Sequence, residues 1–372
     1  MVVGCGALGN EVLKNLALIG VRHLVIVDFD CVEPDNLSRS VLFSREDAAA
    51  GRRKVEAAAD RLRQMNPDID IQPIFGDIAY DVGLGLIRRM NVVIGCVDNR
   101  WARYCINRLC MRAGVPWVDG GINGLEGTAR VFIPGQNCYA CNLGPEGLKD
   151  MAIRMPCAGN IRRDIAAGKA PTTPITASII AAVQVQEAVK LMNHDPSQQL
   201  SILNPQFSIP TSLCGKMFYY EGEHLTTKVV DFKAYDDDCP VHERWEPIES
   251  SPLTTQSTVA ETLDYLNNSQ SSILNSQFSI LLDDPFVDYL FLRSDNSRHE
   301  VMRPAHKVAA FVEQHPKLSA FPFSGFYQHE WHEIGQDFPY QHLILADLGI
   351  PPQAVLIIKS EKERYIELNI EN

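Results

Sequence analysis

The stretch "VVGCGALGN", residues 2–10, combines a short apolar strand, a glycine-rich turn and the start of a helix. Its glycines, Gly4, Gly6 and Gly9, have the spacing G-x-G-x-x-G. Glycines at this spacing permit a tight turn and let a ligand approach the backbone closely, while the start of the helix offers unpaired N–H groups to a phosphate. The stretch therefore predicts a nucleotide-binding turn at the first strand of an α/β sheet.

The same alternation of strand and helix continues over the first 120 residues. Short runs rich in β-branched residues precede longer segments with helical periodicity. We expect strands at 23–30, 68–75, 91–98 and 115–121, and helices at 7–20, 45–66 and 100–114. This rhythm predicts a doubly wound, mostly parallel Rossmann-like sheet, in which ligands bind at the carboxyl ends of the strands. The residues that fall at such ends are Gly4, Asp28, Asp98 and Asp119.

The rest of the chain predicts a return to the sheet and then a smaller domain. Residues 125–135 read as an extended return strand. The apolar stretch 175–192 is interrupted by polar residues, which favours a buried or amphipathic helix over a membrane span. The domains that we expect are a first domain at 1–245, a linker at 246–256 and a smaller α+β domain at 257–372.

Composition restricts the class of partner. The chain has 372 residues and a formal net charge of −12, so a broad surface for nucleic acid or an anionic membrane is excluded. The start of the sequence lacks the pattern of a signal peptide, and we therefore expect a cytoplasmic protein. In a reducing compartment, its ten cysteines read as thiols and metal ligands.

An acidic residue closes the second predicted strand. Asp28 follows Gly9 by 19 residues, at the position where a carboxylate accepts the ribose hydroxyls of a bound nucleotide. NAD and ATP fit this pair of features equally well.

Further polar residues at the strand ends distinguish the two nucleotides. They are Asp30, Asn36, Arg39, Lys54, Asp98 and Asn99. A dehydrogenase has little use for two cations and a spare carboxylate around its pyrophosphate. An enzyme that breaks the α–β phosphate bond does use them, because cations offset charge on the pyrophosphate and a carboxylate can hold Mg²⁺. Taken singly, Lys54 could lie on a solvated helix face, Arg39 in a loop salt bridge, and Asp98 at a helix cap.

The combined motif resembles a known family. Residues 4–39, "GCGALGNEVLKNLALIGVRHLVIVDFDCVEPDNLSR", followed by Lys54 and "CVDN" at 96–99, are similar to the adenylating domain of E1-like ubiquitin-activating enzymes and their sulfur-carrier-activating relatives. The resemblance covers residues 1–245. It implies adenylation of the C-terminal glycine of a small β-grasp protein. The roles it implies are ribose binding for Asp28, phosphate binding for Asn36, Arg39 and Lys54, and Mg²⁺ binding for Asp98.

The sequence departs from the family at two points. Ser40 stands where family members commonly have a Gln. Family members usually also carry a helix before the first strand, whose Arg reaches the ATP site of the facing subunit, whereas this sequence begins at the strand. Either the start is truncated, or another residue or a partner chain supplies the cation. The resemblance implies a homodimer or a heterodimer.

Two residue pairs have the spacing of zinc ligands. Cys138 and Cys141 form one C-x-x-C pair, and Cys239 and His242 form a C-x-x-H pair about a hundred residues later. The resemblance implies that these four residues hold one structural zinc, since a second pair recurs there in the family. Two unrelated thiol pairs are the alternative.

Cys157, in the segment "MPCAGN", remains outside those pairs. In E1 enzymes a cysteine in a similar Met-Pro-x-Cys or Pro-x-Cys context attacks the acyl-adenylate and forms a thioester, although the motif here lacks one spacer residue. Three nearby arginines, Arg154, Arg162 and Arg163, could lower the pKa of this thiol. The alternative is a small buried apolar residue. Cys214 is the second candidate thiol.

The last part of the chain, residues 342–369, resembles part of the ubiquitin-fold domain with which E1 enzymes recruit an E2 conjugating enzyme. A generic α+β accessory domain is the alternative.

Three functions stay open, and a dehydrogenase is a distant fourth. They are an E1 that forms a thioester on Cys157, a sulfur-carrier adenylyltransferase of the thiamine or molybdopterin type, and an inactive nucleotide-binding subunit of a heterodimeric E1.

Overall fold

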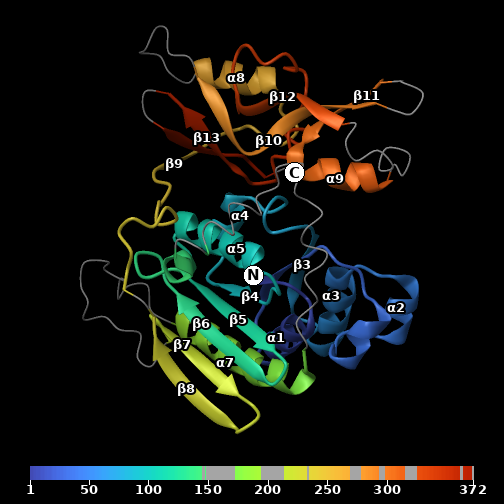
Figure 1. The fold of residues 1–372 in the computed structure, drawn as a ribbon, viewed down its shortest axis with the longest axis vertical. Helices are drawn as coiled ribbons and strands as arrows, with labels where there is room; N and C mark the ends of the chain where they lie inside the picture. Colours follow the sequence, from blue (N-terminus) through green and yellow to red (C-terminus); the bar gives the residue numbers. More distant parts are fainter. Residues whose placement is uncertain are drawn as a thin grey trace. The chain divides into compact units, whose positions relative to one another are not determined.

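The structure is a computed structural model that describes residues 1–144, 147, 172–193, 213–232, 234–268, 278–292, 298–314, 325–360 and 363–370. The described residues form two compact units (Figure 1). The first contains residues 1–79, 87–144 and 172–244, and the second contains residues 80–86 and the chain from Trp245 onward.

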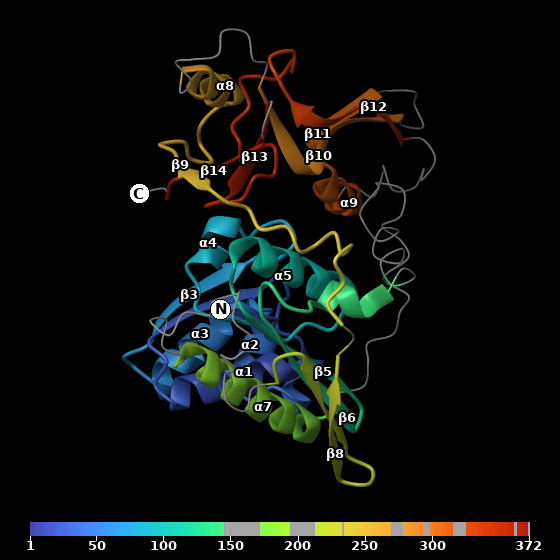
Figure 2. The ribbon, with the colours of Figure 1, turned by 90° about the vertical axis from the view of Figure 1, so that its left-hand side faces the viewer.

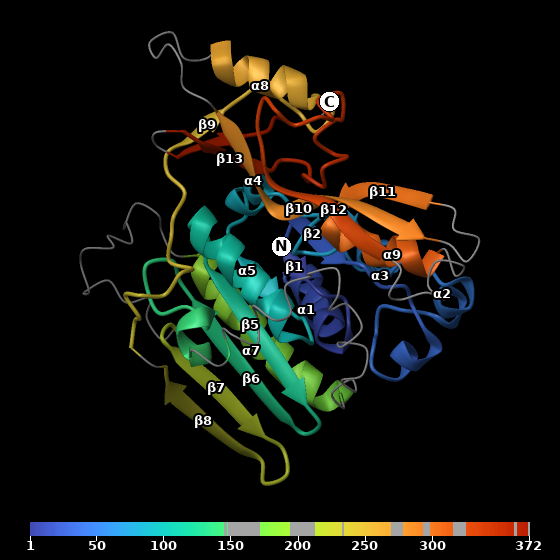
Figure 3. The same ribbon diagram turned by 45° about the horizontal axis from the view of Figure 1, so that its top comes forward.

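The first unit is built on an eight-stranded sheet with the order β3-β2-β1-β4-β5-β6-β7-β8. Its strands are β1 Val2–Val3, β2 His23–Asp28, β3 Asp70–Phe75, β4 Val93–Gly95, β5 Trp117–Asn123, β6 Glu126–Phe132, β7 Lys216–Glu221 and β8 Thr226–Asp231. The first five are parallel and the last three run antiparallel to their neighbours, with β8 at the free edge (Figure 3). The predicted doubly wound, mostly parallel sheet is confirmed. The strand order reverses between β1 and β4, where ligands bind in sheets of this kind.

Helices cover both faces of this sheet. Helices α1 Ala7–Leu18 and α7 Pro174–Met192 lie on one side of the strands and α5 Arg100–Ala113 on the other (Figure 2). Helix α7 has the length and apolar composition of a membrane span. Instead of standing alone, it packs against α1, β5 and β6 and contributes Ile180 and Val185 to the main core. Burial of this helix on the sheet accounts for its apolar sequence.

The predicted helix at 45–66 is wrong as a single element. Gly51 has a φ of 58° and ends α2 Arg45–Ala50 in the left-handed conformation, which favours glycine. A new helix, α3 Lys54–Met65, begins three residues later. Lys54 is therefore the first residue of a helix, next to the carboxyl end of β2, instead of lying in the middle of one.

The second unit is a six-stranded sheet with the order β11-β10-β13-β14-β9, and β12 also pairs with β10. Its strands are β9 Ile248–Ser250, β10 Ser279–Leu292, β11 Arg298–Pro304, β12 Gly325–Ile334, β13 Val355–Lys359 and β14 Arg364–Glu367. Among its described residues, the longer helices are α8 Val259–Asn268 and α9 Ala305–Gln314, and the short helix α4 Leu84–Arg88 begins in the segment 80–86. The predicted hairpin at the end of the chain is present as β13 and β14. Similarity of this unit to a ubiquitin-fold domain stays a prediction.

The domain limits differ from those expected at two places. Strand β9 lies within the predicted linker and pairs with β14 in parallel. The segment 80–86 groups with the second unit, where Tyr80 stacks on His306 at 4.2 Å between ring centroids. Neither pairing has a local sequence signal, because each partner is more than a hundred residues away.

Candidate active site

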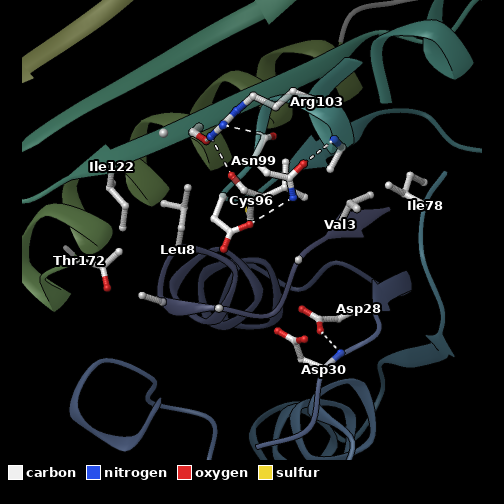
Figure 4. A pocket seen from close by; sticks show the side chains of 18 of the residues that line it. Val3, Leu8, Asp28, Asp30, Ile78, Cys96, Asn99, Arg103, Ile122 and Thr172 are labelled. Carbon is white, nitrogen blue, oxygen red and sulfur yellow. Dashed lines mark hydrogen bonds between the residues drawn. The ribbon is translucent and has the colours of Figure 1, made fainter. Parts of the chain in front are cut away.

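A cavity of about 410 Å³ opens at the carboxyl ends of β1, β2, β4 and β5 in the first unit (Figure 4). Asp28 and Asp30 lie at one end of it, and Asn99 and Arg103 lie at another. The residues predicted to bind a nucleotide that line this cavity are Gly4, Gly6, Asp28, Asp30, Asn36, Arg39, Lys54, Asp98 and Asn99. The tertiary structure thus brings nine separate predictions into one site.

The glycines of the first turn have different roles. Gly4 has a φ of +96°, and a Cβ there would lie 2.5 Å from the carbonyl oxygen of Cys96. A Cβ on Gly6 would meet nothing within 4 Å, so the backbone at Gly6 is open to the cavity. A Cβ on Gly9 would lie 1.9 Å from the carbonyl oxygen of Gly4. Gly9 is not among the residues that line the cavity, and the absence of a Cβ there allows α1 to pack closely on the turn. Its role in binding the cofactor stays a prediction.

Asp28, at the end of β2, accepts two backbone hydrogen bonds. Its Oδ2 accepts from the N–H of Cys5 at 2.6 Å, and its Oδ1 accepts from the N–H of Asp30 at 2.8 Å. Burial raises the pKa of this carboxyl group, although the nearby ammonium of Lys54 and the two N–H donors oppose the rise. The carboxylate is held at the cavity wall, where it can accept hydroxyl groups of a sugar.

Lys54 pairs with Asp30 at the start of α3. The Nζ of Lys54 lies 2.7 Å from Oδ2 of Asp30, and its side chain is only 9% exposed. Burial lowers the pKa of Lys54, but the negative charges of Asp28 and Asp30 outweigh burial and raise it. This lysine is a charged group of the cavity, and the interpretation as a solvated helix face is wrong.

The loop that follows β2 supplies Asn36 and Arg39. Oδ1 of Asn36 accepts a hydrogen bond from the N–H of Glu33 at 3.0 Å and so caps the start of the short helix η1 Pro34–Ser38. Nη1 of Arg39 donates to the carbonyl of Asp35 at 2.9 Å. Both side chains line the cavity beside the buried Ser40, which occupies the position where the family commonly has a Gln.

The end of β4 carries Asp98 and Asn99. The Oδ1 of Asn99 accepts from the N–H of Ala102 at 2.8 Å and caps α5. The helix cap is therefore Asn99, and the reading of Asp98 as the cap is wrong. Asp98 is exposed, and its carboxylate accepts from the amide of Asn99 at 3.3 Å.

Asn10 was missed by the sequence reasoning. It is fully buried, and its Nδ2 donates to the carbonyl of Cys5 at 2.7 Å. Its Oδ1 accepts from the N–H of Leu42 at 2.8 Å. One amide thereby ties the glycine turn to the loop that carries Arg39. Its place directly after Gly9 is the only signal in the sequence.

A buried ion cluster around Asp119, within β5, was also missed. Asp119 is fully buried, and its Oδ1 accepts from Nε of Arg103 at 2.9 Å while its Oδ2 accepts from Nε of Arg130 at 3.0 Å. A second bond joins Nη2 of Arg130 to the same carboxylate. Arg103 also donates from Nη2 to the carbonyl oxygens of Val97 at 2.7 Å and Gly120 at 2.9 Å. Both arginines line the cavity.

The four predicted zinc ligands lie together in the first unit. Ligand atoms of Cys138, Cys141, Cys239 and His242 all lie within 4.8 Å of one another. The Sγ atom of Cys138 is 3.8 Å from that of Cys239 and 3.6 Å from that of Cys141. Tetrahedral zinc with bonds of about 2.3 Å places two sulfurs about 3.8 Å apart. A Cys₃His set with this geometry fits zinc.

Neither candidate thiol is placed as a nucleophile in the described residues. Cys157 lies outside them, as do Arg154, Arg162 and Arg163. Burial and the charge of Glu187 raise the pKa of Cys214 to about 11, so this second candidate stays a thiol at neutral pH.

Three comparisons with known proteins cover the first unit. The model of the ThiF family matches residues 1–241. The SAMP-activating enzyme E1 of Haloferax volcanii is 31% identical over 241 residues, which are 65% of this chain and 78% of the relative. The molybdopterin-synthase adenylyltransferase of Salmonella typhimurium is 34% identical over 201 residues, covering 52% of this chain and 72% of the relative.

Other similarities are narrower. The adenylyltransferase and sulfurtransferase MOCS3 of Sus scrofa is 39% identical over 142 residues, and the chain spans only 31% of its length. A solved structure of Escherichia coli MccB with succinimide aligns with a TM-score of 0.49 at 21% identity, covering 65% of this chain and 64% of that chain. The family model alone matches well over half of the chain, and the chain therefore belongs to the ThiF family.

Proposed function

We propose that the chain uses ATP to adenylate the C-terminal glycine of a small β-grasp protein. One observation carries this proposal: the cavity collects the glycine turn, the strand-end carboxylates Asp28 and Asp98, and the cations Arg39 and Lys54. The chain belongs to the ThiF family, and the names of two of its relatives contain the word adenylyltransferase. A dehydrogenase does not break a phosphate bond, so its reaction would not need the two cations beside the nucleotide.

The reaction can be assigned to groups of the cavity. A carboxylate oxygen of the terminal glycine attacks the α-phosphorus of ATP, an acyl–phosphate bond forms, and the bond to the β-phosphate breaks. Asp28 accepts ribose hydroxyls, and the backbone at Gly6 approaches the phosphates. Arg39 and Lys54 offset the charge that develops on the departing pyrophosphate.

Mg²⁺ fits beside Asp98. Both carboxylate oxygens of Asp28 already accept backbone N–H groups, and Asp30 is paired with Lys54. Asp98 is exposed at the cavity, which suits an ion that keeps several of its waters. When bound, the ion would offset negative charge on the triphosphate.

Zinc is the metal we propose for the Cys₃His cluster. Thiolate and imidazole ligands at tetrahedral spacing favour it over harder ions, and a closed set of four ligands indicates a structural site. The second predicted pair, Cys239 and His242, lies about a hundred residues after the first, so the metal would join two distant segments.

After adenylation, two routes remain for the acyl group. In the E1 route, the Cys157 thiolate attacks the carbonyl carbon, a thioester forms, AMP leaves, and an E2-like enzyme later accepts the acyl group. In the sulfur-carrier route, the terminal sulfur of a donor's persulfide attacks the same carbon, an acyl disulfide forms and AMP leaves. A thiol then reduces this disulfide and releases the carrier's thiocarboxylate. The E1 name of the Haloferax volcanii relative and the sequence context of Cys157 support the first route, and the name of the molybdopterin-synthase adenylyltransferase supports the second.

Incubation with Mg²⁺, ATP and candidate glycine-terminated proteins tests the proposal. We expect release of pyrophosphate that depends on one of these proteins. A thiol-sensitive adduct that Cys157→Ala loses, while pyrophosphate release continues, supports the E1 route. An adduct that survives this substitution contradicts the role of Cys157. Absence of ATP consumption with every carrier would refute adenylation and favour the inactive subunit of a heterodimer.

The assembly and location are part of the same proposal. We propose a homodimer or heterodimer, as the resemblance implies, in the cytoplasm. Sedimentation of the purified chain and fractionation of cells that express it test these two points.

A further inference from the structure

A line of buried side chains lies between the Cys₃His cluster and the cavity, entirely within the first unit. It begins at Tyr139, which stands between the ligands Cys138 and Cys141 and is 4% exposed. The N–H of Tyr139 donates to Oδ1 of Asn107 on α5 at 3.0 Å. The neighbouring ligands and this bond hold the backbone of Tyr139, and its ring packs edge-on against Trp117 and Phe132.

The ring of Tyr139 meets the ion cluster of β5 and β6. The guanidinium carbon of Arg130 lies 5.3 Å from the ring centroid, a distance at which cation and ring attract each other. Arg130 holds Asp119 through two bonds, and Asp119 holds Arg103. The contacts therefore run without a gap from a metal ligand's neighbour to the cavity wall.

Arg103 is the last member of this line. It donates to the carbonyl oxygens of Val97 and Gly120, which both belong to residues that line the cavity. Val97 directly precedes Asp98, the proposed Mg²⁺ ligand. The position of the β4 end thus depends on Arg103, and Arg103 is held in turn by the buried carboxylate.

We propose that Tyr139, Arg130 and Asp119 are positioning residues through which metal bound to the Cys₃His cluster strengthens ATP binding in the cavity. The inference rests on the proposed ATP and zinc sites. The metal ligands hold Tyr139 in place. Arg130 is held in turn by the ring of Tyr139 and by the carboxylate of Asp119, and a buried ion cluster of this kind has few alternative arrangements. Coupling between two binding equilibria is reciprocal, so ATP must also strengthen metal binding by the same factor.

Metal affinity measured with and without nucleotide tests this coupling. The full chain is loaded with Zn²⁺, and a chelator competes for the metal in the absence or presence of Mg²⁺ and a non-hydrolysable ATP analogue. We expect the analogue to raise the apparent Zn²⁺ affinity about fivefold or more in the wild-type chain. A separate titration with the analogue reports whether the nucleotide binds.

Substitutions at the ring test the route of the coupling. Tyr139→Leu removes the aromatic face under Arg130 and leaves every metal ligand in place, so the analogue should no longer change Zn²⁺ affinity. Tyr139→Phe keeps the face and should keep the coupling. Phe232→Leu is the matched control, because Phe232 stacks on Phe132 at 5.2 Å in the same aromatic group. Arg130→Met is a second uncoupling variant, in case Tyr139→Leu fails to fold.

The outcomes separate this inference from the proposed function. If the wild-type chain binds the analogue while its Zn²⁺ affinity stays constant, the coupling is refuted and adenylation is untouched. Retention of the full coupling by folded Tyr139→Leu and Arg130→Met also overturns the assignment of this route. If the wild-type chain does not bind the analogue at all, the ATP site itself is wrong, and both proposals fall.

Discussion

Two carboxylates of neighbouring strands, one just past its strand and one inside it, meet opposite environments. Asp98 follows β4 and is exposed at the cavity, whereas Asp119 lies within β5 and is fully buried between two arginines. The sequence pattern places both at strand ends and distinguishes neither. The neighbours decide the role of each carboxylate: water and ligand reach Asp98, while Arg103 and Arg130 occupy Asp119.

This difference separates groups that act on a ligand from groups that hold the cavity in shape. A carboxylate with accessible oxygens can bind a cation, and a buried carboxylate is tolerated only because it is paired. The comparison predicts that the two aspartates affect different measurements when they are replaced.

The largest effect is expected at Asp119. Asp119→Ala leaves two guanidinium groups in a buried site without their carboxylate, which costs about 3–5 kcal/mol of unfolding free energy. Denaturation in urea, followed by circular dichroism, measures this loss. Asp98→Ala serves as the matched control and should unfold like the wild-type chain. Equal stability of the two variants would break the comparison.

Asp98→Ala should instead affect the reaction. Without this carboxylate Mg²⁺ loses its proposed ligand, and the negative charge of the triphosphate is then poorly offset. We expect adenylation to slow about 10²- to 10³-fold, the effect typical of removing one stabilising group. Pyrophosphate release with the cognate carrier measures the rate, and the denaturation curve should stay unchanged because Asp98 is exposed. A variant that adenylates at the wild-type rate contradicts the assignment of Mg²⁺ to Asp98.

Asp28 should give a smaller effect that depends on pH. Burial raises its pKa, so as the pH falls it takes up a proton before an exposed aspartate does and loses its capacity to accept ribose hydroxyls. We expect the affinity for adenosine, which carries no phosphate, to fall about tenfold on acidification. Calorimetric titrations of wild-type chain and Asp28→Asn measure this dependence. A wild-type affinity as insensitive to pH as that of the variant would argue against ribose binding by Asp28.

The smallest effect is expected in the second unit, where an arginine–carboxylate pair lies at the surface. Arg364 donates from Nε and Nη2 to Glu249 at 2.9 and 2.6 Å, and this bonding lowers the pKa of Glu249. The side chain of Glu249 is 44% exposed, so Glu249→Gln should cost no more than about 1 kcal/mol.

The pH dependence of that cost follows from the sign of the shift. Because the pKa of Glu249 is lowered in the folded state, its ion pair stabilises the fold at pH values above the ordinary pKa of glutamate. This contribution to the free energy of unfolding is lost as the pH falls through the lowered pKa. Urea denaturation of the wild type and Glu249→Gln should therefore differ at neutral pH and converge in acid. If Glu249→Gln lost as much unfolding free energy as Asp119→Ala, burial would not be what decides how much an ion pair stabilises this protein.

Much of the cavity could be predicted from the sequence because the strands are parallel. The carboxyl ends of parallel strands lie at one edge of such a sheet, so Asp28 and Asp98 had to lie near the glycine turn. Lys54 lies there only because α3 begins beside the end of β2. The same reasoning could not separate Gly9 from Gly6, since spacing does not report which Cα faces a neighbouring carbonyl. It also missed the break at Gly51, where helical periodicity hides a residue in the left-handed conformation.

Contacts between distant segments left no pattern to read. Arg103 and Arg130 lie on a helix and a strand that each bury only part of their residues, and nothing in the spacing of the two arginines indicates a shared carboxylate. Strand β9 looked like a linker because its pairing partner, β14, lies more than a hundred residues later.

By itself, the sequence determined the glycine turn, the polar residues that follow the parallel strands and two separate pairs of metal-ligand candidates, because motif spacing and strand order suffice to find each of these. That the two pairs form one cluster was implied by the family resemblance and is shown by the tertiary structure. Only the tertiary structure decided which carboxylate is exposed to a ligand and which is enclosed. Burial and ion pairing depend on what packs around a side chain, and that packing is made by segments far apart in the chain.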